Sequence, residues 1–177
     1  MTDRTTSHPT WDRDAIALNR EQIQDTFQSF PSAVVAIGTM VDEEPLIMIA
    51  TSFAVGTSFD PPMCMFAVQN SSTTWPALSS GVKLGISILG TGHRDTIYQL
   101  ASRKQKSRLD GIAWTTLPSG AVTLEESPVW LECSIADQIP AGDHHVILLN
   151  LHASSVATDH EPLIHHRATF GRYQQHT

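Results

Sequence analysis

The chain has few lysines and no excess of positive charge. Only three of its 177 residues are lysine, and 18 acidic residues outnumber 11 basic ones, which gives a formal net charge of −7. Proteins that bind nucleic acid or anionic lipid surfaces usually carry a basic surplus or a polybasic segment. We therefore expect neither nucleic acid nor a membrane as a partner.

Long hydrophobic runs are also missing. Residues 1–14 are polar and charged and lack the apolar segment of a signal peptide. The uncharged stretch from Pro61 to Val82 contains six consecutive polar residues, Gln69 to Thr74, so it cannot span a bilayer. These features predict a soluble, cytoplasmic protein.

Cysteine is scarce, and no CxxC pair occurs, which excludes a zinc ribbon or a thioredoxin-type motif. Cys64 and Cys133 both lie in apolar, strand-like runs, so we expect two reduced, buried thiols. Four of the nine histidines form two adjacent pairs, His144–His145 and His165–His166. Adjacent side chains on a strand point to opposite faces, so neither pair easily chelates one ion and we expect no metal site.

The length and the 41% hydrophobic content are typical of one folded domain. We expect a flexible arm over residues 1–12 and a single domain over residues 13–177. A helix is predicted from Asp14 to Phe30, because its apolar residues Ile16, Ile23 and Phe27 fall on one face. Pro31 ends this helix, since proline disfavours the helical conformation of the residue before it.

The rest of the chain is rich in β-branched and alternating apolar runs. We expect strands at residues 33–41, 46–53, 63–69, 83–89, 129–139 and 144–156, shorter pieces at 111–117 and 122–124, a last strand near Thr169, and short helices at 72–80 and 94–103. Turns rather than long crossover helices connect most of the strands. The pattern predicts an antiparallel barrel or sandwich with helical inserts.

Three polar clusters separate the strands: Ala50–Phe53 with the following Gly56–Ser58, then Gln69–Trp75, and then Ala141–His144. Hydroxyl-rich turns beside apolar strands can present oxygen atoms and backbone N–H donors to a phosphate or a polar heterocycle. Each cluster taken alone can equally be a set of turns and helix caps. Their order along the chain is more informative than any one of them.

In that order the segments resemble the flavin reductase family, the small reductases that feed reduced flavin to two-component monooxygenases. The resemblance runs from about residue 27 to residue 173 and rests on Phe30–Val35, Ala50–Phe53, Ser58–Pro62, Asn70–Trp75, Asp110–Trp114, Trp130–Cys133, Gly142–His144 and Pro162–Ile164. One departure is the segment from Ser52 to Asp60, which is one residue longer than the commonest pattern, with Gly56 as the extra residue.

The resemblance implies a mainly β fold, the six-stranded antiparallel FMN-binding split barrel, assembled as a homodimer. It implies reduction of FMN, FAD or both by NADH or NADPH, with the reduced flavin passing to a partner monooxygenase. It also implies roles for eight residues: Thr51, Ser52 and Phe53 at the isoalloxazine ring, Thr57, Ser58, Ser72 and Thr73 near the ribityl and phosphate groups, and His144 beside the ring and the nicotinamide.

The sequence leaves several alternatives open. The protein could instead hold FMN tightly and act on its own substrate, or bind flavin or haem without catalysis. The preferred flavin and the preferred nicotinamide are undecided. The basic cluster of Arg103, Lys104, Lys106 and Arg108 either contacts anionic phosphates of these cofactors or forms a solvated loop.

Overall fold

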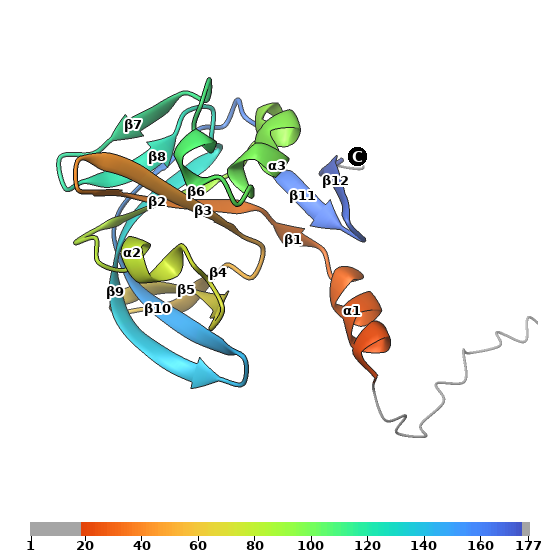
Figure 1. The fold of residues 1–177 in the computed structure, drawn as a ribbon. Coiled ribbons are helices and arrows are strands. Elements are labelled where there is room, and N and C mark those ends of the chain that lie inside the picture. Colours follow the sequence, from red (N-terminus) through yellow and green to blue (C-terminus); the bar gives the residue numbers. More distant parts are fainter. Residues whose placement is uncertain (1–18, 175–177) are drawn as a thin grey trace, which may run out of the picture.

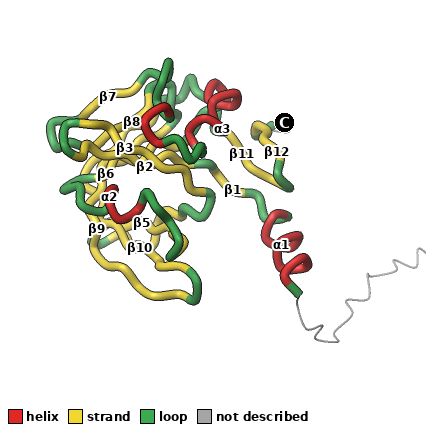
Figure 2. Tube along the Cα trace, viewed as in Figure 1, coloured by secondary structure: helices red, strands yellow, loops and turns green. Residues whose placement is uncertain are grey.

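The computed structural model describes residues 19–174, and strands dominate this part of the chain (Figures 1 and 2). The helices are α1 (Arg20–Gln28), α2 (Trp75–Leu78) and α3 (Ile97–Leu100), with 3-10 turns η1 (Thr91–Thr96) and η2 (Gln105–Ser107). The strands are β1 (Ser32–Ala33), β2 (Val35–Val41), β3 (Glu44–Ala50), β4 (Ala54–Phe59), β5 (Pro62–Gln69), β6 (Leu84–Ile88), β7 (Trp114–Thr116), β8 (Ala121–Leu124), β9 (Val129–Ala141), β10 (His144–Val156), β11 (Leu163–His166) and β12 (Thr169–Arg172). No helix within residues 19–174 is both long and apolar enough to cross a bilayer.

Six antiparallel strands form a curled sheet in the order β3-β2-β6-β9-β10-β5. β3 and β5 approach each other at the two ends of this series, yet no ladder of backbone hydrogen bonds joins them in the described part of the chain. The barrel is therefore open along one seam, which we call the split. β4 extends the sheet beyond β5, and β7 and β8 extend it from the second half of β2.

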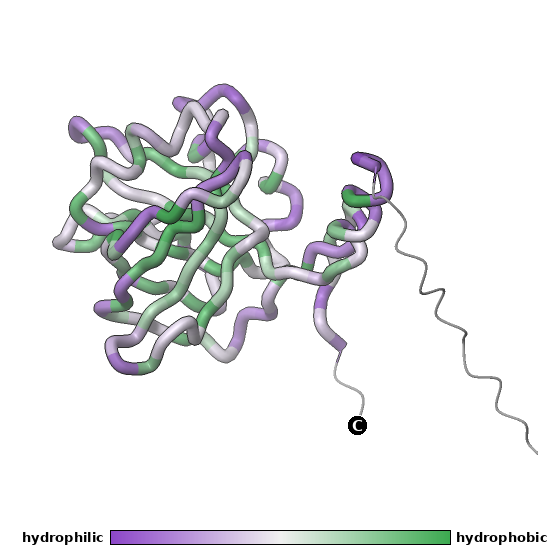
Figure 3. Tube along the Cα trace, turned by 90° about the horizontal axis from the view of Figure 1, so that it is seen from below, coloured by the Kyte–Doolittle hydropathy of each residue, from purple (hydrophilic) through white to green (hydrophobic). Residues whose placement is uncertain are grey.

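β2 lies between two hydrophobic clusters because its side chains alternate. Val35 and Ile37 point into the barrel, where they join Phe66 and Trp75, whose rings meet edge to face at 5.3 Å. Val34, just before β2, and Ala36 pack on the other side, against α3 and β11. Apolar segments accordingly follow the strands of the main body, and most hydrophilic segments lie in its loops (Figure 3).

The expected hairpin at residues 33–41 and 46–53 is present as β2 and β3. Asp42 and Glu43 both have positive φ angles, 49° and 66°, as a two-residue type I′ turn requires. The second strand ends at Ala50 rather than Phe53, and β4 occupies a segment expected to be a loop. A bulge hides β4 from pattern analysis, because residues 56 and 57 have no partner on β5 and break the alternation.

The expected helices are shorter than predicted. Asn19 caps α1 through a capping box with Gln22, so this helix begins at Arg20. Residues 14–18 and the expected arm at 1–12 lie outside the described part. The helix expected at 72–80 shrinks to α2. The one expected at 94–103 becomes η1 and α3 and ends at Leu100, where the chain turns towards Arg108.

Both cysteines are buried inside the barrel, as expected, and neither forms a disulfide. Cys64 on β5 and Cys133 on β9 face each other with 3.7 Å between their sulfur atoms. They lie on the two strands that flank β10. The hydrogen bond with Cys64 and burial raise the pKa of Cys133, while the hydrogen bond with Cys133 lowers the pKa of Cys64.

Candidate functional site

A cavity of about 740 Å³ opens at the split between β3 and β5. Its lining consists of residues 48–52, 67–69 and 71–74, together with Arg103 and His144. These positions come from the end of β3, the end of β5, the loop before α2, the loop after α3 and the first residue of β10 (Figure 1). The cavity brings together five of the eight residues predicted for the site: Thr51, Ser52, Ser72, Thr73 and His144.

Ser52 fastens the loop after β3 to β5 across the split. Its hydroxyl donates to the carbonyl oxygen of Ala67 and accepts from the N–H of the same residue, both at 3.0 Å. This side chain thus does locally what a backbone ladder would do elsewhere in the sheet. Its one proton is engaged within the protein, so the Ser52 hydroxyl can accept a hydrogen bond from a ligand but cannot donate one.

The loop before α2 is also ordered by its own side chains. The Ser72 hydroxyl accepts a hydrogen bond of 3.1 Å from the N–H of Trp75, the first residue of α2. The Thr74 hydroxyl instead accepts from Gln105 at 3.0 Å and from Arg108 at 3.3 Å. Hydroxyl oxygens within this loop therefore serve first as structural acceptors.

Two hydroxyl groups of the cavity lining are both exposed and without any hydrogen bond to the described residues. Thr51 and Thr73 are exposed, and their hydroxyl groups form no hydrogen bond with any other residue in 19–174. The backbone N–H groups of Thr51 and Thr73 are likewise unpaired within that range. The rim thus combines Ser52, Ser72 and Thr74, whose hydroxyl oxygens hold the loops, with Thr51 and Thr73, whose hydroxyls can donate to a bound molecule.

His144 begins β10 and lines the cavity, with 35% of its side chain exposed. Its Nδ1 atom lies 2.7 Å from a carboxylate oxygen of Asp143, a contact that fixes the orientation of the ring. This contact also lowers the pKa of the Asp143 carboxyl group. Nε2 forms no hydrogen bond with the residues in 19–174 and is left free for a ligand. The neighbouring His145 does not line the cavity and instead contacts the Asn70 side chain at 2.7 Å.

The predicted basic cluster divides into two parts with different environments. Arg103 lines the cavity, and Lys104 and Lys106 are exposed beside it. Arg108 is buried, donates to the carbonyl oxygens of Ser102 and Ile47 and to the Thr74 hydroxyl, and forms no ion pair within the described chain. Burial lowers its pKa. Arg103 was not among the eight residues predicted for the site, although its place in the cluster of positive charges could have identified it.

Three predicted site residues do not line the cavity. Phe53 packs against the barrel core, and Thr57 and Ser58 lie on β4, at the free edge of the sheet. Thr57 is one of the two bulge residues without a partner on β5. Contacts of these three residues with a cofactor remain predictions.

The cavity combines an apolar wall with positive and hydrogen-bonding groups. Met48, Ile49 and Val68 supply apolar surface, whereas Arg103 is a permanent cation. None of the lining residues is an aspartate or a glutamate. The volume lies in the range of ordinary small-molecule sites. A planar heterocycle that carries a polyol chain and a phosphate fits this set of groups, so the residues present suit a flavin.

Comparison with known proteins gives consistent matches. Residues 27–174 match the family model of the flavin reductase like domain. The chain is 21% identical over 157 residues to a flavin reductase of Pseudomonas putida, with 89% of this chain and 92% of that protein covered. It is 26% identical over 156 residues to the flavin-dependent monooxygenase reductase subunit HsaB of Rhodococcus jostii, with coverages of 88% and 79%.

The fold is also shared with solved structures. The NADH:FAD oxidoreductase SgcE6 of Streptomyces globisporus C-1027 superposes with a TM-score of 0.81 at 23% identity, covering 90% of this chain and 96% of that one. This likeness confirms the predicted mainly β fold of the split-barrel type.

Proposed function

Because the chain belongs to the flavin reductase-like family, we propose that the cavity at the split is the place where it binds flavin and NAD(P)H for reduction of the flavin. The family assignment confirms the enzyme class predicted from the sequence, an NAD(P)H:flavin oxidoreductase. The observation that carries the site assignment is the cavity itself, which is free of carboxylates and offers unpaired threonine hydroxyls, one histidine and one arginine.

The flavin supplies the hydride-accepting ring when it is bound, so the protein needs to bind, orient and shield rather than to provide an acid–base pair. Met48, Ile49 and Val68 offer an apolar surface to a ring system and exclude water from it. Thr51 and Thr73 donate hydrogen bonds to its polar groups. Arg103 provides charge for a phosphate.

His144 is the residue we assign to ring orientation. Asp143 occupies its Nδ1 side, so Nε2 is the ring nitrogen left to hydrogen bond to the flavin or to the nicotinamide amide. We assign it no proton transfer in the hydride step. Phe53, Thr57 and Ser58 belong to this proposal as residues that a bound flavin could reach from beyond the cavity.

We also propose that the reduced flavin passes to a separate monooxygenase in the cytoplasm. The support comes from relatives such as HsaB, which is a reductase subunit of a flavin-dependent monooxygenase.

The proposed assembly is a homodimer. α1 has no buried residue and lies beside the main body (Figure 1), which leaves Phe27 and Phe30 exposed. On the edge strand β4, Val55 and Phe59 are exposed as well. A second copy that covers such surfaces would remove apolar area from water. Light scattering should return a mass near twice 19.4 kDa, and a mass of one chain that does not change with concentration would contradict the dimer.

A steady-state assay that crosses NADH and NADPH with FMN and FAD tests the proposed function directly. Oxidation of the nicotinamide must depend on added flavin. A protein that stays yellow after dialysis and needs no added flavin would instead be a tight flavoprotein. A protein that binds flavin but leaves both nicotinamides unoxidised would be a non-catalytic binding protein and would contradict the proposal.

A further inference from the structure

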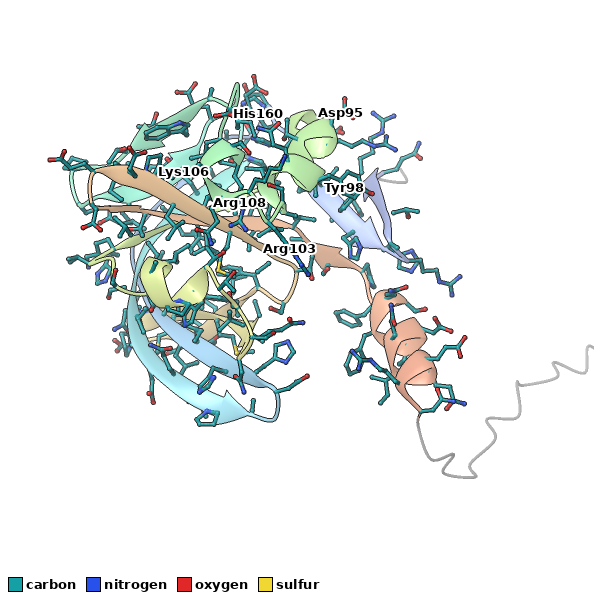
Figure 4. All side chains as sticks on the ribbon, in the orientation of Figure 1. Asp95, Tyr98, Arg103, Lys106, Arg108 and His160 are labelled. Carbon is teal, nitrogen blue, oxygen red and sulfur yellow. The ribbon has the colours of Figure 1, made fainter. Side chains whose placement is uncertain are left out.

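Two further hollows continue from the cavity along the loop after α3. The first, of about 500 Å³, shares Arg103 with the cavity and is lined by residues 103–107 and Asp110. The second, of about 250 Å³, shares Gln105 and Lys106 with the first. Figure 4 shows Arg103 and Lys106 on either side of Arg108 in this region. The cavity and the two hollows therefore lie next to one another along this loop, and we call them the series.

The loop that forms this series is held in place. Arg108 is buried beneath it and donates to the carbonyl oxygen of Ser102 at 2.7 Å and to the Thr74 hydroxyl at 3.3 Å. The Gln99 side-chain amide donates to the carbonyl oxygens of Ser107, Arg108 and Asp110 at 2.8 to 3.2 Å. These contacts make the hollows a built feature and not the surface of an unanchored loop.

The chemical character changes along the series. The first hollow places Arg103, Lys104 and Lys106 against a single carboxylate, Asp110, so its balance is positive. The second hollow is mainly apolar, with Pro45, Leu46, Ala77 and Leu109 in its lining, one carboxylate at Glu44, and the Gln105 amide and Lys106 at its entrance. A phosphate region is therefore followed by a slot suited to a flat heterocycle with polar edges.

We propose that this series is the diphosphate and adenine subsite of the flavin, which makes FAD rather than FMN the preferred substrate. Arg103, Lys104 and Lys106 bind the diphosphate, and the slot beside Ala77 and Leu109 receives the adenine. FMN ends at its single phosphate and reaches only Arg103. The inference rests on the proposed function and specifies its substrate.

A nicotinamide dinucleotide also carries a diphosphate and an adenine, but the position of the loop favours the flavin. Gln105 and Arg108 both hydrogen bond to Thr74, so the loop is attached to the segment 72–74. That segment contains Thr73, whose free hydroxyl lines the cavity and is assigned to the polar groups of the flavin in the proposed function. The His144 side chain, assigned to the nicotinamide side, hydrogen bonds to Asp143 and to no residue of the loop among residues 19–174.

Direct binding of oxidised FAD and FMN, measured by calorimetry without any nicotinamide, tests the subsite. The wild-type protein should bind FAD at least about tenfold more tightly than FMN. The double variant Lys104→Gln/Lys106→Gln should raise the Kd for FAD by about tenfold, the combined effect of two partly screened charge contacts, and change the Kd for FMN less than about twofold. Ala77→Leu places a larger side chain in the second hollow from an exposed position on α2. It should raise the Kd for FAD and leave the Kd for FMN unchanged.

The control is Arg94→Gln/Arg172→Gln, which removes the same charge from exposed positions outside the three hollows. It should leave both Kd values unchanged. Equal Kd values of FAD and FMN, or equal losses for both flavins in the lysine variant, would overturn the subsite. A rise in the KM of NADH or NADPH without a change in FAD binding would assign the series to the nicotinamide dinucleotide and also overturn it.

The failure of this inference and that of the proposed function are separable. A protein that shows the FAD preference but reduces no flavin with either nicotinamide would contradict the function and leave the subsite intact. A protein that reduces FMN and FAD and binds them equally would contradict only the subsite. Thermal unfolding of each variant verifies that the exposed substitutions leave the fold unchanged.

Discussion

Replacement of Ser52 by alanine should reduce the stability of the protein as well as any binding at its cavity. The hydroxyl of Ser52 donates to and accepts from the backbone of Ala67, and it does so across the split, where β3 and β5 share no ladder. The substitution removes both hydrogen bonds and leaves the N–H and the carbonyl of Ala67 without this partner. From the position of Ser52 in a turn alone, one would expect the substitution to leave folding unchanged. The two hydrogen bonds across the split instead predict a loss of stability.

The magnitude follows from the two bonds. A hydrogen bond contributes about 0.5–1.5 kcal/mol net, and water can partly replace the lost partner because Ala67 is only half-buried. We therefore expect the free energy of unfolding to fall by about 1–2 kcal/mol. For a chain of this size each kcal/mol corresponds to roughly 2–4 °C in Tm.

Urea unfolding without flavin measures this effect, with Thr73→Val as the matched control. Thr73 has a free hydroxyl, so its replacement should leave the unfolding midpoint unchanged but weaken flavin binding by about 1 kcal/mol, the value of one lost hydrogen bond. An unfolding midpoint of Ser52→Ala equal to that of the wild type would refute the bridging role. An unchanged flavin affinity of Thr73→Val would refute the assignment of the free Thr73 hydroxyl to ligand binding.

Three further predictions concern other parts of the molecule. His144→Ala should lower kcat/KM for flavin reduction by about ten- to a hundredfold, the scale of one lost orienting hydrogen bond. His145→Ala should have far less effect, because His145 contacts Asn70 outside the cavity. Equal losses of kcat/KM for both variants in steady-state assays would exclude a special role of His144. Gly85→Ala should destabilise the protein by about 1–3 kcal/mol or prevent folding, because a Cβ atom there would collide with the carbonyl oxygen of Val122 on β8. A Tm of the variant equal to that of the wild type would contradict this packing. Cys64 and Cys133 should resist iodoacetamide in the native protein and react after unfolding, because both are at most 2% exposed. Mass spectrometry measures the alkylation. If the thiols of the native protein react as fast as an exposed thiol does, the barrel opens and this prediction is wrong.

The sequence alone determined the class of fold and the identity of most strands. Alternation at residues 84–88 and 129–135 and the apolar run before Asp42 reflect burial of one or both faces of a strand, and such burial is a property of local sequence. The ordered polar clusters pointed to the family and to five residues that meet at the cavity. β4 escaped detection because its bulge and its edge position remove the alternation on which pattern analysis depends.

Only the tertiary structure decided what each polar residue of the site does. Ser52 and Thr51 are adjacent in sequence and similar in chemistry, yet one hydroxyl bonds to β5 and the other is free, because the split brings Ala67 within reach of just one of them. Arg103 and Arg108 belong to one charged run, but the turn after α3 exposes the first and buries the second against Ile47 and Thr74. Contacts between residues far apart in the chain depend on how the sheet curls, and no local pattern of residue types encodes that distance.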